Sequence, residues 1–248
     1  MTRQFLAALS VLAVIVLLAY VAVLPHSASP SPKELSVISR TKGNEVLTAE
    51  VLDHQVRIRL KNNHKYTITA FAIEFAETVI KEDFAYSEIH FGIEPGDTFQ
   101  KDYAFSESSI RSQPLYLLTV LLKDGTKDGD SKVAQEIKDE RSGEKLQIFR
   151  TLRVLEKDGQ SLKDLKTIKS DIVAALDSGD SETLITLNEL EPAQRVKSKL
   201  SDDLKNGLQV GREKMLQRFE VLERLPTEHR EKGATEFKER ANKLFAKL

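Results

Sequence analysis

Three closely spaced aspartates form the stretch of this sequence whose residue types point most directly to binding chemistry. Asp124, Asp128 and Asp130 lie in the run DGTKDGD, where oxygen-bearing side chains surround two glycines. Oxygen ligands arranged around a glycine turn are what a calcium loop requires. Counted from Asp124, however, the twelfth position holds Gln135 where the EF-hand pattern needs a bidentate Glu. The alternative interpretation is a glycine-rich turn between a strand and a helix, in which Asp130 or Ser131 caps the helix.

The other residue types that carry chemistry are scattered along the chain. The histidines are residues 26, 54, 64, 90 and 229, and no two of them have the short spacing of a zinc site. A histidine cluster could form only in the folded chain. Cysteine is absent, and no GxSxG elbow, phosphate loop or dinucleotide fingerprint occurs. We therefore predict a non-catalytic protein without a cofactor, and keep Asp124, Asp128 and Asp130 only as calcium candidates.

The elements that would position these residues begin with strands over residues 35–124. Short apolar runs in this region are separated by turn signals, which is typical of an antiparallel β-sandwich. The run VRIRLKNNHKYTITAFAIEF, residues 56–75, indicates a hairpin of two strands joined at Asn62–Lys65. The apolar face of its second strand changes phase near Thr69, which predicts either a bulge or a strand buried on both faces. Leu115–Leu122 is apolar at nearly every position, so we expect it deep inside the sandwich.

Residues 130–248 have a helical pattern, because their apolar residues recur at steps of three and four. We expect a first helix broken near Gly143, and then helices over about 161–176, from Ser181 to Pro192, over 193–225 and over 227–248. Gly207 and Gly211 are expected to allow close packing between helices. Since each apolar stripe needs a partner, the pattern predicts a helical bundle over residues 130–248.

An uncharged apolar run, FLAALSVLAVIVLLAYVAVL at residues 5–24, precedes both regions. Its length matches a hydrocarbon core of roughly 30 Å, so residues 1–24 are predicted to be a transmembrane signal-anchor. The alternative is a signal peptide that is cleaved, which would leave a secreted protein. Residues 25–34 are rich in Pro and Ser and predict an extended linker. With few flanking charges, Arg3 favours an amino end in the cytoplasm, and hence a single-pass membrane protein whose bulk is extracytoplasmic.

Residues 54–105 carry a resemblance to a known family. The run VRIRLKNNHKYTITAFAIEF followed by IEPGDTF is similar to the small immunoglobulin-like modules of bacterial envelope proteins, including the FxLYD type. The Phe-x-Leu-Tyr-Asp run that names that type is missing here. The resemblance implies a β-sandwich in an extracytoplasmic setting and assigns no functional residue. The predicted fold class is therefore α+β, with an N-terminal transmembrane helix, an antiparallel immunoglobulin-like β-sandwich and a C-terminal α-helical bundle.

Two functions are compatible with these patterns. The 37 basic and 38 acidic residues give a net charge of −1, which disfavours a nucleic-acid partner. The first function is that of a membrane-anchored extracytoplasmic interaction or scaffold protein, attached through its N-terminal helix and binding an envelope protein. The alternative is a periplasmic ligand- or calcium-binding sensor or carrier, with its site where the sheet meets the bundle, near Asp124 to Asp130.

Overall fold

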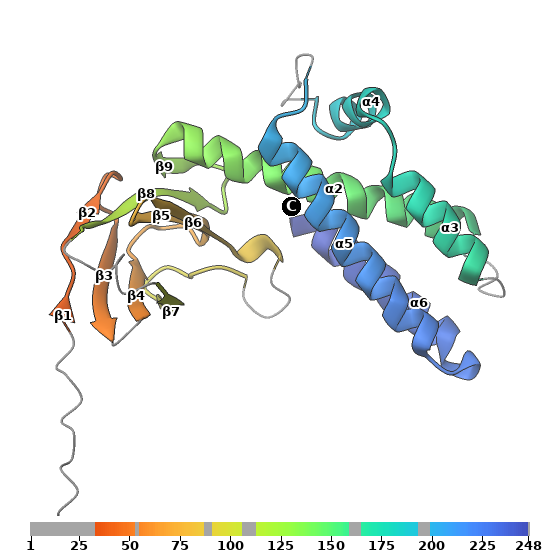
Figure 1. The fold of residues 1–248 in the computed structure, drawn as a ribbon, viewed down its shortest axis with the longest axis horizontal. Coiled ribbons are helices and arrows are strands. Elements are labelled where there is room, and N and C mark those ends of the chain that lie inside the picture. Colours follow the sequence, from red (N-terminus) through yellow and green to blue (C-terminus); the bar gives the residue numbers. More distant parts are fainter. Residues whose placement is uncertain are drawn as a thin grey trace, which may run out of the picture.

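The structure, a computed structural model, describes residues 33–52, 55–86, 91–105, 113–158, 165–192 and 199–247. Its strands are β1 (Lys33–Glu34), β2 (Val37–Ser39), β3 (Glu45–Leu52), β4 (Gln55–Asn62), β5 (Ile68–Phe75), β6 (Thr78–Asp83), β7 (Thr98–Ala104), β8 (Leu115–Leu122) and β9 (Lys127–Gly129). Its helices are α2 (Ser131–Asp158), α3 (Leu165–Leu176), α4 (Asp180–Leu190), α5 (Asp202–Arg224) and α6 (Thr227–Lys247), with a 3₁₀ turn η1 (Phe84–Tyr86). The strands stack as two sheets, and the helices extend from one side of them (Figure 1).

The two sheets have different strand orders. The first sheet has the order β1-β3-β4-β7 with antiparallel pairs, and the second has the order β2-β8-β5-β6, with β9 paired to β8. Strand β2 runs parallel to β8. The wholly antiparallel sandwich predicted from the sequence is corrected at this point. The reason is that β1 and β2 belong to one short segment, which pairs first with β3 and then changes sheet to pair with β8.

The predicted hairpin over residues 56–75 is wrong, because its two strands belong to different sheets. Strand β4 lies in the first sheet and β5 in the second, so the chain between them forms an arch from one sheet to the other. Strand β5 is buried on most of both faces, since the sandwich core lies on one side of it and α2 on the other. The register of β5 against β8 shifts between Ile68 and Ala70, which confirms the bulge predicted near Thr69.

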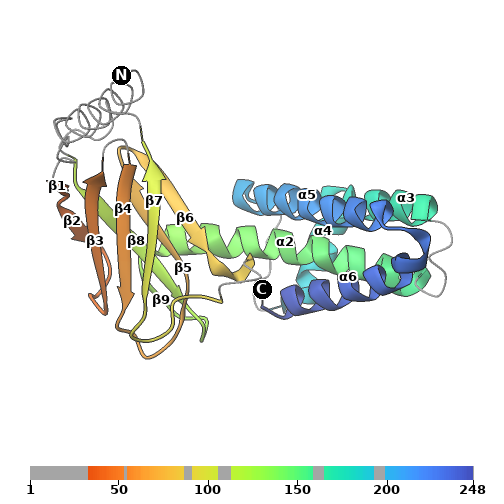
Figure 2. The same ribbon diagram turned by 90° about the horizontal axis from the view of Figure 1, so that it is seen from below.

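Helix α2 connects the sandwich to the bundle. Its first turns cover the outer face of the second sheet, and the rest of it lies among the other helices (Figure 2). The apolar contact between α2 and the sheet is made by Ala70, Ala72, Leu118, Leu121, Ala134 and Ile137. The molecule therefore has three layers at its sandwich end, which are the first sheet, the second sheet and α2.

Helix α2 is unbroken, so the break predicted near Gly143 is wrong. A Cβ on Gly143 would overlap the backbone of Leu204 on α5. A Cβ on Gly207 would overlap the backbone of Glu140 on α2 in the same way. The close helix packing predicted for Gly207 and Gly211 is thus confirmed, and it offsets the roughly 1 kcal/mol by which a glycine weakens a helix interior.

None of the helices formed by the described residues is long and apolar enough to cross a membrane. Even α2, the longest of them, carries charged side chains along its whole length, which a bilayer core would not accommodate. The predicted transmembrane segment, residues 1–24, lies outside the described residues, as does most of the predicted linker 25–34. The fold class is therefore corrected to α+β, with two sheets and five α-helices in the described part of the chain. The described helices therefore do not support the predicted membrane attachment or the predicted single-pass localisation.

Candidate metal centre

The three calcium candidates have three different structural roles. Asp124 lies in the turn between β8 and β9, where its Oδ1 accepts hydrogen bonds from the backbone N–H and the hydroxyl of Thr126, at 3.0 and 2.6 Å. Asp130 caps α2, because its Oδ1 accepts from the N–H groups of Lys132 and Val133 at 2.8 and 3.2 Å. The capping alternative is thus confirmed for Asp130. Asp128, on β9, is buried. The three aspartates therefore do not act together as a calcium loop.

Asp128 instead belongs to a cluster that the fold assembles from distant parts of the chain. Glu45 begins β3 in the first sheet, His64 lies in the arch between β4 and β5, and Asp128 lies on β9 in the second sheet. One ligand atom from each residue lies within 4.8 Å of the other two. His64 Nε2 and Glu45 Oε2 are hydrogen-bonded at 2.6 Å. An imidazole nitrogen and two carboxylates thus meet where the two sheets close over each other.

The arch that carries His64 is held by Asn62, the last residue of β4. Its Nδ2 donates hydrogen bonds to the carbonyls of Tyr66 and Ile93, at 2.9 and 2.7 Å. Its Oδ1 accepts the N–H of His64 at 2.8 Å. Because Asn62 is fully buried, these three bonds fix the arch and direct His64 inward.

Asp128 is oriented by its own hydrogen bonds. The backbone N–H of Lys42 donates to Asp128 Oδ2 at 3.1 Å, and the hydroxyl of Thr119 donates to the Asp128 carbonyl at 2.8 Å. Partners of this kind hold a ligand side chain in position and tune its basicity. The cluster therefore has the supporting contacts that a metal site needs, as well as the ligand atoms.

Glu45 is the electrostatically unusual member of the cluster. Its side chain is 0% exposed, and its Oε1 is buried with no hydrogen-bond partner among the described residues. Burial raises the pKa of the Glu45 carboxyl above its ordinary value; the hydrogen bond and charge of His64 oppose this, and the charge of Asp128 adds to it. A buried carboxylate oxygen without a partner is costly. The site is therefore incomplete without a proton or a cation at Glu45.

Of the three cluster residues, His64 also lines a pocket of about 460 Å³, together with Lys65, Asp124 and other residues. Hydrogen bonds from Thr126 and the nearby charge of Lys65 hold the pKa of Asp124 below its ordinary value, so this carboxylate is ionised near neutral pH. Lys65 lines the same pocket, so its positive charge offsets the negative charge of Asp124. Asp124 therefore lines the pocket beside His64 and lies outside the cluster.

Sequence reasoning found Asp128 but missed Glu45 and His64. His64 is 19 residues from Glu45 in the chain, a separation that matches no metal-binding motif. One signal was present: Glu45 shares the parity of Leu47 and Ala49, whose side chains face the core of the sandwich. A carboxylate at a core position of a strand needs a partner, and that rule could have drawn attention to it.

No family model, curated protein or solved structure was found that matches this chain. The resemblance of residues 54–105 to immunoglobulin-like envelope modules is therefore still a prediction. So is its implication of an extracytoplasmic spacer or interaction module.

Proposed function

We propose that this protein binds a divalent transition-metal ion, for which Zn²⁺ is the probe, through Glu45, His64 and Asp128. The proposal rests chiefly on the buried Oε1 of Glu45, which has no partner among the described residues and belongs to the carboxylate that contacts His64. It is a refined form of the ligand-binding alternative drawn from the sequence. The ligand set is different, and with it the preferred ion.

The donor set favours Zn²⁺ over Ca²⁺. Calcium takes six to eight oxygen ligands, whereas the cluster offers three ligand atoms, one of which is an imidazole nitrogen. Imidazole with carboxylates suits zinc and its neighbours in the transition series. Three protein ligands and one further position, filled by water or by a small ligand, make a common zinc geometry.

The distances are compatible with such an ion after small movements. In tetrahedral coordination at about 2.0–2.2 Å, the ligand atoms would be about 3.4 Å apart. The present separations lie on either side of that value, since His64 Nε2 and Glu45 Oε2 are 2.6 Å apart and the three atoms lie within 4.8 Å. Binding would replace the proton shared by His64 and Glu45 with the metal ion, so protons would be released on binding.

The test is a titration of the full-length protein after treatment with a chelator. We expect uptake of one Zn²⁺ per chain by calorimetry and a rise in melting temperature, because an ion at a hundred times its Kd stabilises the folded state by about 2.7 kcal/mol. Ca²⁺ at the same concentration should leave the melting temperature unchanged. The wild-type chain taking up no Zn²⁺ in a one-to-one ratio would show the proposal to be wrong.

Variants separate this site from adventitious binding. His64→Gln and Glu45→Gln should each abolish the stoichiometric uptake, and Glu45→Gln also removes a buried charge, so the metal-free variant should stay folded. The matched control is His229→Gln, which alters an exposed histidine on α6 and should bind Zn²⁺ like the wild type. Equal uptake by His64→Gln and His229→Gln would contradict the assignment.

The interaction or scaffold role predicted from the sequence stays a prediction, and membrane attachment is no longer part of it. The same holds for the expectation of a non-catalytic protein. Neither the fold nor the comparisons with known proteins test these two statements.

A further inference from the structure

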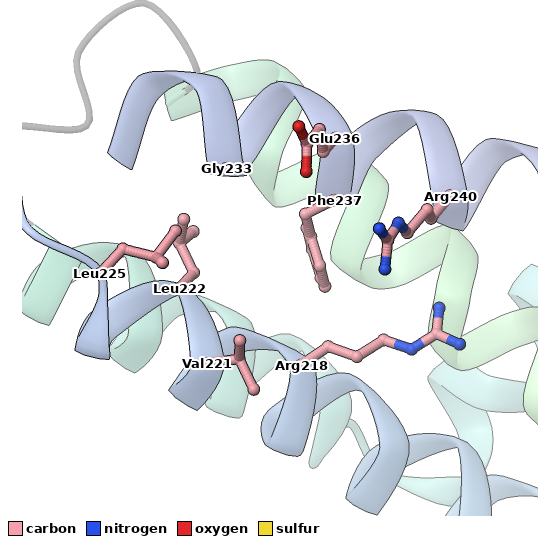
Figure 3. A pocket seen from close by; sticks show the side chains of 8 residues that line it. All are labelled: Arg218, Val221, Leu222, Leu225, Gly233, Glu236, Phe237 and Arg240. Carbon is pink, nitrogen blue, oxygen red and sulfur yellow. The ribbon is translucent and has the colours of Figure 1, made fainter. Parts of the chain in front are cut away.

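A groove at the far end of the bundle has the form of a second ligand site. It lies between α5 and α6, close to the turn at Leu225 and Pro226 that joins these helices, and its volume is about 330 Å³ (Figure 3). That volume is at the lower end of the roughly 300–1,000 Å³ range of small-molecule pockets. A ligand of this groove must therefore be small.

The two ends of the groove differ in chemistry. At one end Leu222 and Leu225 lie opposite Gly233, and at the other end the guanidinium groups of Arg218 and Arg240 face each other (Figure 3). The buried ring of Phe237 lies between the two ends. The matching ligand has an apolar tail and a negatively charged head.

Arg240 supplies the charge that selects the head. Within the described part of the chain, Arg240 makes no hydrogen bond or ion pair, and its guanidinium group faces another cation, Arg218. Arginine binds a carboxylate through two parallel hydrogen bonds, and the guanidinium group of Arg240 is exposed and so accessible to such a ligand. Glu236 also lines the groove, and its Oε1 is 4.0 Å from Lys232 Nζ on the exposed side of α6.

We propose that this groove binds a free medium-chain alkyl carboxylate. The carboxylate lies between Arg240 and Arg218, and the alkyl chain lies along Phe237 toward Leu222 and Leu225. Burial of the alkyl chain at the apolar end is favourable because it removes hydrocarbon surface from water, while the charged head lies beside the arginines.

The test is a titration of the full-length protein with octanoate, followed by ligand-observed NMR. Acetate keeps the charge without the tail, and 1-octanol keeps the tail without the charge. We expect saturable binding of one octanoate, and affinities at least about tenfold lower for the other two, since each lacks one of the two contacts. If acetate bound as tightly as octanoate, the alkyl chain would make no contact and the site would hold an adventitious ion only. If 1-octanol bound as tightly as octanoate, the arginines would not select the carboxylate. Either result would contradict the proposal.

Three variants locate the binding in the groove. Arg240→Gln should weaken octanoate binding at least about tenfold. Gly233→Val should abolish it, because a Cβ at this position would lie 2.5 Å from Leu225 Cδ1 and the added methyl groups would fill the apolar end. Arg224→Gln is the matched control, since Arg224 is 79% exposed on α5 and does not line the groove.

Two results would overturn the proposal. One is that Arg240→Gln and Arg224→Gln bind octanoate with the same affinity. The other is that a short peptide ending in Leu binds more tightly than octanoate, which would replace the free carboxylate with the C-terminus of a protein partner. Melting temperatures of all three variants show whether each chain is folded under the conditions of the titration.

Discussion

Glu144 is a buried acid whose charge opposes folding. It lies on α2 against α5, almost fully buried, and Lys214 Nζ donates to its two oxygens at 2.9 and 3.2 Å. Burial raises the pKa of the Glu144 carboxyl to about 7; Lys214 opposes this, and the nearby charges of Asp83 and Glu140 add to it. Because the pKa is higher in the folded than in the unfolded chain, the folded state binds the proton more tightly. The resulting stabilisation is fully present below about pH 4.5 and is lost as the pH rises to about 7.

Glu144→Gln should flatten this part of the dependence of stability on pH. An interval of about 2.5 pH units at about 1.4 kcal/mol per unit corresponds to a change of about 3.5 kcal/mol, which the variant should not show. The measurement is the free energy of unfolding in urea at pH 5, 6, 7 and 8. Glu213→Gln, at an exposed position on α5, is the control and should follow the wild type. Parallel curves for Glu144→Gln and the wild type would contradict a raised pKa.

At the scale of elements, the contact between α2 and α5 depends on the absence of side chains. Gly207→Ala should lower the free energy of unfolding by about 1–3 kcal/mol, because the added Cβ meets the backbone of Glu140 and no rotamer change can relieve the overlap. This net loss is expected even though alanine in place of glycine stabilises a helix interior by about 1 kcal/mol, because the overlap costs more than that. Gly179→Ala is the matched control, since a Cβ there has no atom within 4 Å. A Gly207→Ala chain as stable as the control would show that the helices are less tightly packed.

Most helices and strands could be predicted from the sequence where a local pattern decides them. Leu115–Leu122 forms β8 as expected, and Pro226 separates α5 from α6. Strand β6 was missed because its turn with β5 uses Ala76 and Glu77 at φ of 50° and 62°, a conformation usually signalled by Gly or Asn. The start of α5 was placed too early, since Ser201 caps the helix with a hydrogen bond of 3.1 Å to the N–H of Leu204.

The candidate site was less predictable than the elements around it. Asp128 was a candidate for the wrong reason, as part of a local calcium loop. Its partners come from a strand of the other sheet and from the arch at His64, and only the pairing of strands brings them together. The arch itself was expected to be a hairpin, because alternation within a strand does not say which sheet the strand joins.

At the scale of the whole molecule, two groups of ion pairs hold the sandwich to the bundle. Arg141 on α2 binds Asp83 on β6 through two bonds of 2.7 and 2.8 Å, and it also donates to the carbonyl of Thr69 at 3.0 Å. Lys81, also on β6, lies within 3.3 Å of Glu136, Glu140 and Asp203. The side chains of Arg141 and Asp83 are only 15% and 13% exposed, so their charges depend on each other. We infer that this pair couples the unfolding of the two parts.

The natural distribution of tyrosines allows this coupling to be measured. Four of the 5 tyrosines, residues 66, 86, 103 and 116, lie in the sandwich region before α2, and Tyr20 lies outside the described residues. Trp is absent, so in the variant Tyr20→Phe tyrosine fluorescence reports on the sandwich, while far-UV circular dichroism reports mainly on the helices. In the Tyr20→Phe chain we expect both probes to give one coincident urea transition. Asp83→Asn and Arg141→Gln should each cost about 3–5 kcal/mol and separate the two transitions, because each leaves a buried charge without its partner. In the double variant the loss of unfolding free energy should be smaller than the sum of the two single losses, by about 1–3 kcal/mol.

The exposed pair of Arg212 and Asp177, at 2.6 Å, is the matched control. Arg212→Gln should cost less than about 1 kcal/mol and leave the two transitions coincident. If Arg141→Gln behaves like Arg212→Gln, the apolar contact of α2 with the second sheet holds the two parts together without the ion pair.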